Sequence, residues 1–152
     1  MNALAVSLLI ILLVNITSAT VSVAVFGHMS VGKTTLCRSL TNSPIFDDES
    51  PTIGAAYFTT TLKSPHEGDP PIRMSLWDTA GQERFRAMTP IYMAQAKIVL
   101  LVYDVSDVES IRQLQQMCEQ FEERLKSEKR HIFVGNKSDL LTDQHSDEEC
   151  DP

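Results

Sequence analysis

The chain has 152 residues, of which 43% are hydrophobic and 22% are charged, and its formal net charge at pH 7 is −7. This composition is that of one ordinary globular domain and excludes a disordered or fibrous protein. The negative charge argues against a nucleic-acid partner, because such a surface needs clustered Lys and Arg. The three cysteines stand at wide, unrelated spacings, which favours a reducing compartment over a disulfide framework or a zinc site.

Residues 1–19 form an N-terminal segment that differs from the rest of the chain. Residues 3–14 are apolar apart from Ser7, but the run is shorter than a bilayer span, which takes about 20 residues. Its length suits a signal-peptide core, a weak membrane anchor or a packing helix. A signal peptide would have a Lys or Arg before the apolar run, and this chain has none there. The sequence therefore leaves these alternatives open.

Strand and helix patterns then alternate along the chain. Residues 20–26 are a β-branched apolar run that predicts a buried strand, and a helix is expected over 34–40. Residues 55–63 and 72–78 flank a turn-rich loop, which predicts an antiparallel hairpin. One face of its second strand would carry Ile72, Met74 and Leu76.

Two more strands and a long helix are predicted in the second half. Residues 97–104 and 131–136 have the apolar character of buried strands. Between them, Ser106 and Glu109 have the spacing of a capping box, and the helix is expected to run to about Lys129. The apolar residues at helical intervals that would form its buried face are Ile111, Leu114, Cys118, Phe121 and Leu125.

The order of these elements predicts the fold class. Strands that alternate with helices imply an α/β domain with a mostly parallel sheet, helices on both of its faces, and ligands at the carboxyl ends of the strands. We expect this domain to cover residues 20–141. Residues 142–152 read as an acidic, disordered tail, because they have no apolar face to bury.

The stretch GHMSVGKT, residues 27–34, matches the phosphate-loop pattern G-x-x-x-x-G-K-[ST] between a predicted strand and a predicted helix. Backbone N–H groups of such a loop wrap around phosphates, and the helix N-terminus adds a favourable dipole. We expect Lys33 to reach the terminal phosphates and the Thr34 hydroxyl to bind magnesium. A chance loop of Gly and Lys is the alternative.

A second motif, WDTAGQE, occupies residues 77–83, where a predicted strand ends. Asp78 is placed to hold a magnesium ion through water, and the backbone N–H of Gly81 could approach a γ-phosphate. Gln82 is the candidate catalytic residue, which would orient the attacking water. An ordinary strand-to-helix turn is the alternative for this motif when it stands alone.

A third motif, NKSD, follows the last predicted strand and points to guanine as the base. The carboxylate of Asp139 can accept hydrogen bonds from N1–H and the 2-amino group of guanine, and adenine offers no matching donors. Asn136 would fix the loop and the N7 edge of the base, and the stem of Lys137 would cover one face of the ring.

The three motifs, together with PTIGAAYF and VLLVYDVSD, occur in the order found in Ras-superfamily small GTPases. The stretches TIGAAYF and WDTAGQERF most resemble the Rab family, especially its early-endosomal branch. The similarity covers residues 20 to about 141. The resemblance implies a P-loop NTPase fold that binds GTP or GDP with Mg²⁺. The expected phosphate-binding residues are Gly27, Ser30, Val31, Gly32, Lys33, Thr34, Thr35, Thr52 and Gly81.

The resemblance also implies a switch. Thr52 would close over magnesium and the γ-phosphate, so that the expected metal-binding residues are Thr34, Thr52 and, through water, Asp78. The switch segments would be residues 45–58 (switch I) and 79–92 (switch II), which bind effector and regulator proteins. Such a protein hydrolyses GTP and acts in intracellular vesicle trafficking.

Met29 is the first departure from the Rab pattern, because it replaces a small residue beside the expected γ-phosphate. The resemblance suggests that a large group here crowds the glutamine that positions water, so we predict retained binding and slow hydrolysis of GTP. The alternative is that Met29 points to solvent and changes little, since methionine is adaptable.

The two other departures concern the C-terminal part of the chain. The last strand and final helix of a small GTPase do not follow Leu141, which favours a fragment, a splice form or a faulty gene model over a domain completed by residues 3–14. The chain ends with Cys150, Asp151 and Pro152, which fit no prenylation pattern, so membrane association is uncertain. We expect a cytoplasmic protein at the cytosolic face of endomembranes, because a secreted switch would meet little GTP. A truncated pseudo-GTPase that binds partners without nucleotide, or has no function, is the alternative.

Overall fold

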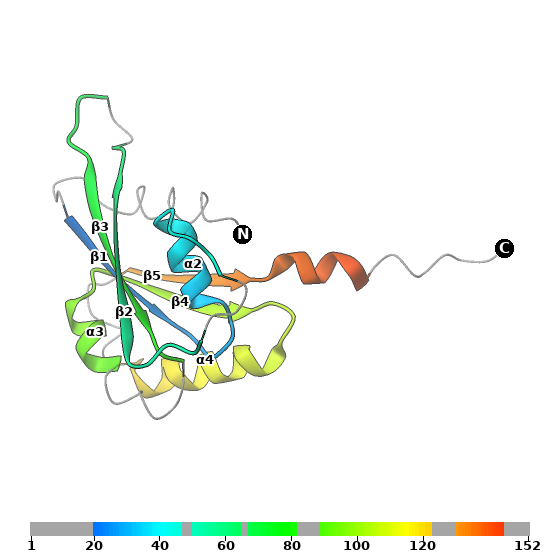
Figure 1. Cartoon of the computed structure of the whole chain (residues 1–152). Coiled ribbons are helices and arrows are strands. Elements are labelled where there is room, and N and C mark those ends of the chain that lie inside the picture. The colour runs from blue at the N-terminus through cyan, green and yellow to red at the C-terminus, as the bar shows by residue number, and fades with distance from the viewer. Residues whose placement is uncertain (1–19, 47–49, 65–66, 82–88, 123–129, 145–152) are drawn as a thin grey trace.

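The computed structural model describes residues 20–46, 50–64, 67–81, 89–122 and 130–144 (Figure 1). Within these ranges the strands and helices alternate as expected. Their bounds are β1 Thr20–Phe26, α2 Lys33–Leu40, β2 Ala55–Leu62, β3 Ile72–Thr79, α3 Thr89–Gln95, β4 Ile98–Asp104, α4 Val108–Gln120, β5 Arg130–Asn136 and the 3₁₀ helix η2 Ser138–Gln144.

The strands of the described residues form one sheet in the order β2-β3-β1-β4-β5. β1 lies between β3 and β4 and is parallel to both, and β5 continues the sheet parallel to β4. Only β2 runs the other way, paired with β3 as an antiparallel hairpin. The predicted hairpin and the predicted mostly parallel sheet are therefore confirmed, and the carboxyl ends of β1, β3, β4 and β5 share one edge.

Helices cover both faces of the sheet, as predicted (Figure 1). Because side chains alternate along a strand, β1 sends Val23 into the core under α2 and Ala24 into the core under α3 and α4. The three β3 residues that were predicted to share one face are Ile72, Met74 and Leu76, and all of them lie in the core under α2. The alternation of apolar residues therefore places α2 and the pair α3 and α4 on opposite sides.

The N-terminus of α4 differs from the prediction. The N-cap is Asp107, whose side chain accepts a hydrogen bond of 2.9 Å from the Glu109 backbone N–H. Ser106, which was predicted to cap the helix, instead donates its hydroxyl to the Asp104 carboxylate at 2.6 Å. The predicted capping box is wrong because the serine hydroxyl is engaged by the strand that precedes it.

The buried face and the end of α4 also differ from the prediction. The helix ends at Gln120, and residues 123–129, including Leu125, lie outside the described residues. Ile111 is 42% exposed, whereas Leu114 and Met117 are buried against the sheet. The row Ser110, Leu114 and Met117 faces the sheet, and Ile111 lies about 100° further around a helix. Cys118 and Phe121 are partly buried against this core, as predicted.

The ends of the chain lie largely outside the described residues. Residues 1–19 and 145–152 are not described, and within the described ranges no helix has the length and apolar character needed to cross a membrane. The expected tail begins later than predicted, because residues 142–144 belong to η2. The first turn of this 3₁₀ helix is closed by the Leu140 N–H, which donates to the Lys137 carbonyl at 3.1 Å, a local bond that composition alone does not reveal.

Candidate functional site

Residues of all three sequence motifs gather at the carboxyl edge of the parallel strands. The phosphate loop, residues 27–34, follows β1, and Asp78 is the second-last residue of the neighbouring strand β3. On the other side, Asp104 ends β4 and Asn136 ends β5, and the two residues are direct partners in the sheet. This edge is where open parallel sheets bind their ligands.

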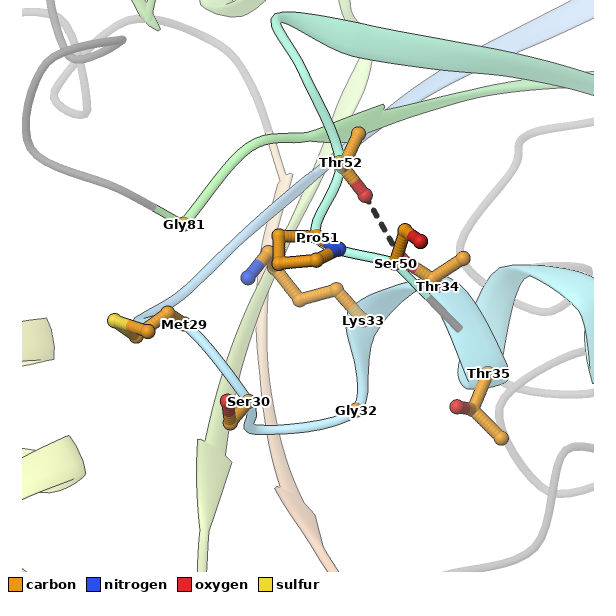
Figure 2. A pocket seen from close by; sticks show the side chains of 10 residues that line it. All are labelled: Met29, Ser30, Gly32, Lys33, Thr34, Thr35, Ser50, Pro51, Thr52 and Gly81. Carbon is orange, nitrogen blue, oxygen red and sulfur yellow. Dashed lines mark hydrogen bonds between the residues drawn. The ribbon is translucent and has the colours of Figure 1, made fainter. Parts of the chain in front are cut away.

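A cavity of about 230 Å³ lies over the phosphate loop (Figure 2). Seven of the nine predicted phosphate-binding residues line it: Ser30, Gly32, Lys33, Thr34, Thr35, Thr52 and Gly81. The other two lie elsewhere, since Val31 is buried in the core under α2 and Gly27 lines a separate small cavity. The cavity also takes in Met29, Ser50 and Pro51; the last two had not been proposed for the site.

Lys33 lies across the phosphate loop with its charge largely withdrawn from water. Only 6% of the residue is exposed, and its Nζ donates a hydrogen bond of 2.7 Å to the His28 carbonyl. Burial lowers the pKa of Lys33 from 10.5 to about 8, and the nearby Asp78 carboxylate partly opposes this shift. An anion that entered the cavity would therefore strengthen the charged form of this lysine.

Three oxygen-bearing side chains from separate elements meet beside Lys33. The Thr34 hydroxyl donates to Asp78 Oδ2 at 2.7 Å. The same hydroxyl lies 3.1 Å from the Thr52 hydroxyl (Figure 2). The Thr52 hydroxyl in turn lies 3.4 Å from the same carboxylate oxygen. Hydroxyl and carboxylate oxygens are ligands that Mg²⁺ prefers, so this donor set fits the predicted magnesium site.

Gly32 and Asn136 join the phosphate loop to the end of β5. Gly32 precedes α2 with a φ of 89°, and a Cβ at this position would lie 2.4 Å from the side-chain nitrogen of Asn136. That nitrogen donates a hydrogen bond of 2.9 Å to the Val31 carbonyl. Glycine is required here by both the backbone angle and the close approach, and Asn136 ties the NKSD motif to the phosphate loop.

Gly81 is packed closely against the phosphate loop. A Cβ at Gly81 would lie 2.5 Å from the Met29 backbone nitrogen and 2.6 Å from Lys33 Nζ. One residue earlier, the Ala80 N–H donates to the Gly54 carbonyl at 2.9 Å, which connects the two predicted switch segments. The predicted catalytic residue Gln82 lies outside the described residues.

The candidate guanine-binding residues flank the end of β5. Lys137 has a φ of 58°, and its ammonium group forms an ion pair of 2.8 Å with Asp104 Oδ2. The hydrogen bonds from Lys137 and then from Ser106 lower the pKa of Asp104 from 3.8 to about 2. Asp139 lies exposed in the first turn of η2.

Sequence reasoning missed Asp104 as part of the site. A signal was available, since Asp104 is the polar residue that ends an apolar strand whose carboxyl end was expected at the ligand edge. Its partner, Lys137, could not be inferred from sequence spacing, because the two residues stand 33 positions apart in the chain.

Comparison with known proteins gives the family. The family model described as the Ras family matches residues 22–150. The chain belongs to the Ras family. The relatives of the chain include Ras-related proteins of the Rab group. The predicted resemblance to Rab proteins is therefore confirmed.

Three relatives illustrate the similarity of this Ras-family chain. The GTP-binding protein YPT53 of Saccharomyces cerevisiae is 32% identical over 133 residues, which are 88% of this chain and 59% of the relative. The Ras-related protein Rab-21 of Mus musculus is 34% identical over 123 residues, or 81% of this chain and 54% of the relative. The Ras-related protein Rab-30 of Homo sapiens is 34% identical over 118 residues, which are 78% of this chain and 57% of the relative. The chain thus spans less than two thirds of the length of each relative.

Proposed function

We propose that the chain is a Rab-type small GTPase, a molecular switch that binds GTP and GDP with Mg²⁺, hydrolyses GTP slowly, and acts in intracellular vesicle trafficking. The observation that carries this proposal is the meeting of Lys33, Thr34, Thr52 and Asp78 over the phosphate loop. We place its action in the cytoplasm, at the cytosolic face of endomembranes. The likeness of residues 52–58 to the early-endosomal Rab branch favours endosomes.

The phosphate end of the nucleotide would be held by the loop and its lysine. Lys33 is buried and already points its ammonium group at a loop carbonyl, so phosphate oxygens would replace that acceptor with a charged one. Thr34 and Thr52 would hold Mg²⁺ with their hydroxyls, and Asp78 would hold it through water. The ion would neutralise charge on the β- and γ-phosphates. Gln82 would orient the attacking water.

The guanine end would be read by the residues at the end of β5. Asp139 would accept two hydrogen bonds from the base, and its exposed position on η2 leaves its carboxylate reachable from solvent. Asn136 would support the loop, since it bonds the Val31 carbonyl at 2.9 Å. The Lys137 ion pair with Asp104 favours a fixed course for the Lys137 stem beside the base.

Slow hydrolysis is the part of the proposal that depends on Met29. Its backbone lies against Gly81, one residue before the proposed catalytic Gln82, and the side chain is 47% exposed at the edge of the cavity. The side chain points away from Lys33 and Thr34 in Figure 2, which leaves the phosphate-binding groups clear. Its bulk would therefore spare nucleotide binding. We propose that it acts instead on the positioning of water beside Gly81.

Effector and regulator proteins would bind where the two switch segments meet. The rings of Tyr57 and Trp77 are 4.7 Å apart, and those of Trp77 and Tyr92 are 5.5 Å apart, so three aromatic residues connect switch I with switch II. In the same two switch segments, Ile53 is 80% exposed and Ile91 is 55% exposed. Exposed apolar side chains of this kind are typical of protein-binding surfaces.

The same aromatic surface supports a second candidate, an interaction protein that needs no nucleotide. None of these three aromatic residues lines the cavity over the phosphate loop, so a partner could bind them whether or not that cavity holds a ligand. The two candidates differ in one measurable property, which is whether the purified protein retains guanine nucleotide.

The deciding experiment is to denature the purified full chain with acid and to identify and count the released nucleotide by chromatography. We expect guanine nucleotide in near-stoichiometric amount. Asp139→Asn should weaken GDP binding by about 100-fold, because two hydrogen bonds to a charged acceptor are lost. Asp69→Asn, the same exchange in the loop between β2 and β3, serves as the control and should leave affinity unchanged. Folded protein that carries no nucleotide and binds none would favour the second candidate.

A further inference from the structure

Arg38 holds the chain segment that follows α2. Its guanidinium lies 5.0 Å from the centre of the Phe46 ring and 5.8 Å from the centre of the Phe58 ring. At the same time its Nη1 donates a hydrogen bond of 3.1 Å to the Pro44 carbonyl. One side chain therefore joins the start of switch I to strand β2, which contains Phe58.

The backbone of Arg38 takes part in the same attachment. Its carbonyl accepts hydrogen bonds from the Ser43 N–H at 2.9 Å and from the Thr41 N–H at 3.2 Å. The hydroxyls of Thr41 and Ser43 lie 2.8 Å apart and close the turn. These bonds fold residues 41–43 back onto the last turn of α2.

A second attachment lies one helical turn away. Thr34 and Arg38 stand four residues apart on α2 and therefore project from the same face of the helix. Thr34 contacts Thr52 at 3.1 Å, so this face holds switch I at two points, near its start and near Thr52. Both attachments open onto one cavity of about 420 Å³, which is lined by Thr34, Arg38, Phe46 and Thr52, among others.

The two attachments depend on the ligand in different ways. The Thr34–Thr52 contact uses the hydroxyls that would bind Mg²⁺, so it must rearrange whenever the ion binds or leaves. The Arg38 contacts use only protein groups, and neither Arg38 nor Phe46 lines the cavity over the phosphate loop. Nothing in the Arg38 attachment needs to change with the nucleotide.

We infer that Arg38 is a positioning residue that anchors Pro44–Phe46 to α2 in every nucleotide state, so that the nucleotide-dependent part of switch I begins after Phe46. This inference rests on the proposed GTPase function. Arginine suits the role because its planar guanidinium can stack on rings while its N–H groups donate to a carbonyl, which an ammonium group does less well. The anchor would also slow nucleotide release, because it holds the chain that leads to Ser50, Pro51 and Thr52.

A simpler role for Arg38 is to place positive charge at the C-terminus of α2, where it favours the helix dipole. Lysine would keep that charge and lose the combination of stacking and hydrogen bonding. Methionine has a similar length, but it would lose both the positive charge and the combination of stacking and hydrogen bonding. The pair Arg38→Lys and Arg38→Met therefore separates anchoring from charge.

The test combines amide hydrogen exchange with the release of fluorescent GDP from the full chain. In the parent protein we expect the same protection of residues 43–46 with GDP and with a non-hydrolysable GTP analogue, and a difference at residues 52–54. Arg38→Met should speed exchange at 45–46 about tenfold in both states and speed GDP release about tenfold. The exchange and GDP-release rates of Arg38→Lys should be closer to those of Arg38→Met than to those of the parent. Arg112→Met, which alters an exposed arginine on α4, is the control and should change neither quantity.

Three results would overturn the inference: protection at 43–46 that changes with the nucleotide, unchanged exchange in Arg38→Met, or an Arg38→Lys protein that behaves as the parent. Circular dichroism of each variant checks that it is folded. If the parent retains no guanine nucleotide, the proposed function fails. The anchor is then judged separately, by comparing exchange at 45–46 in the parent and in Arg38→Met without nucleotide.

Discussion

Met29 lies where the phosphate loop meets the start of switch II. Its backbone nitrogen is 2.5 Å from the place that a Cβ on Gly81 would occupy, so nothing larger than glycine fits opposite it. Met29 is 47% exposed and its side chain has several rotatable bonds, so the side chain can adopt different rotamers in front of Gly81. In the proposed GTPase, this position adjoins the segment that would carry the catalytic Gln82.

We predict that Met29→Gly raises the rate of GTP hydrolysis about tenfold, which corresponds to about 1.4 kcal/mol of transition-state stabilisation. The physical reason is that removal of the side chain frees the space in which the attacking water is positioned. Single-turnover hydrolysis of GTP measures this rate. Met29→Leu is the matched control, because it keeps the bulk and should remain slow. Equal rates in the glycine variant and the parent would mean that Met29 points to solvent without consequence.

At the scale of elements, strands β4 and β5 are joined at their carboxyl ends. Asp104 and Asn136 are paired in the sheet, and Lys137, which follows β5, reaches back to Asp104 at 2.8 Å. Asp104 also accepts hydrogen bonds from the backbone and hydroxyl of Ser106. These contacts fix the loop that carries the NKSD motif relative to the end of β4.

We predict that Lys137→Met raises the pKa of Asp104 from about 2 toward its ordinary value of 3.8. Because the carboxyl is more acidic in the folded chain than in the unfolded one, the pair stabilises the fold above about pH 4 and loses this effect as the pH falls toward 2. The variant should therefore be less stable than the parent above about pH 4, and this difference should shrink as the pH falls toward 2. Titration of the Asp104 carboxyl by NMR measures the pKa, with Lys63→Met as a control. An unchanged pKa would show that Ser106 alone holds the carboxylate.

At the scale of the whole molecule, the candidate site exists only when several elements are assembled. The phosphate loop follows β1, Asp78 comes from β3, Thr52 precedes β2, and Asn136 ends β5. An unfolded chain cannot bring these residues together, so a nucleotide that binds them binds the folded state alone. Binding should then stabilise the entire domain by mass action.

We predict that GDP with Mg²⁺, at about 100 times its dissociation constant, adds about 2.7 kcal/mol to the free energy of unfolding. For a chain of this size the melting temperature should rise by roughly 5–10 °C. Removing Mg²⁺ with a chelator should reduce this shift, because the ion that Thr34 would hold beside the phosphates is lost. Thermal unfolding monitored by circular dichroism measures the effect, and ATP is the control. An equal shift with ATP would contradict guanine recognition through Asp139.

Much of the fold could be predicted because it depends on patterns that are local in the chain. The strand at 20–26, the hairpin over 55–78 and the helix that follows the phosphate loop all agree with the structure. The errors occur where two local signals compete. Ser106 and Asp107 are both suitable N-caps, and only the position of Asp104 at the end of β4 draws the serine hydroxyl away from the helix.

The sequence by itself determined the order of the elements, the phosphate loop, and the residue types that suit phosphate, magnesium and guanine, because each depends on neighbours only a few positions away. Only the tertiary structure decided that Asn136 bonds the phosphate loop, that Lys137 pairs with Asp104, and that Arg38 stacks on Phe58. Such contacts join residues that lie tens of positions apart in the chain. They form only because the parallel strands bring their carboxyl ends to one edge and α2 packs across one face of the sheet.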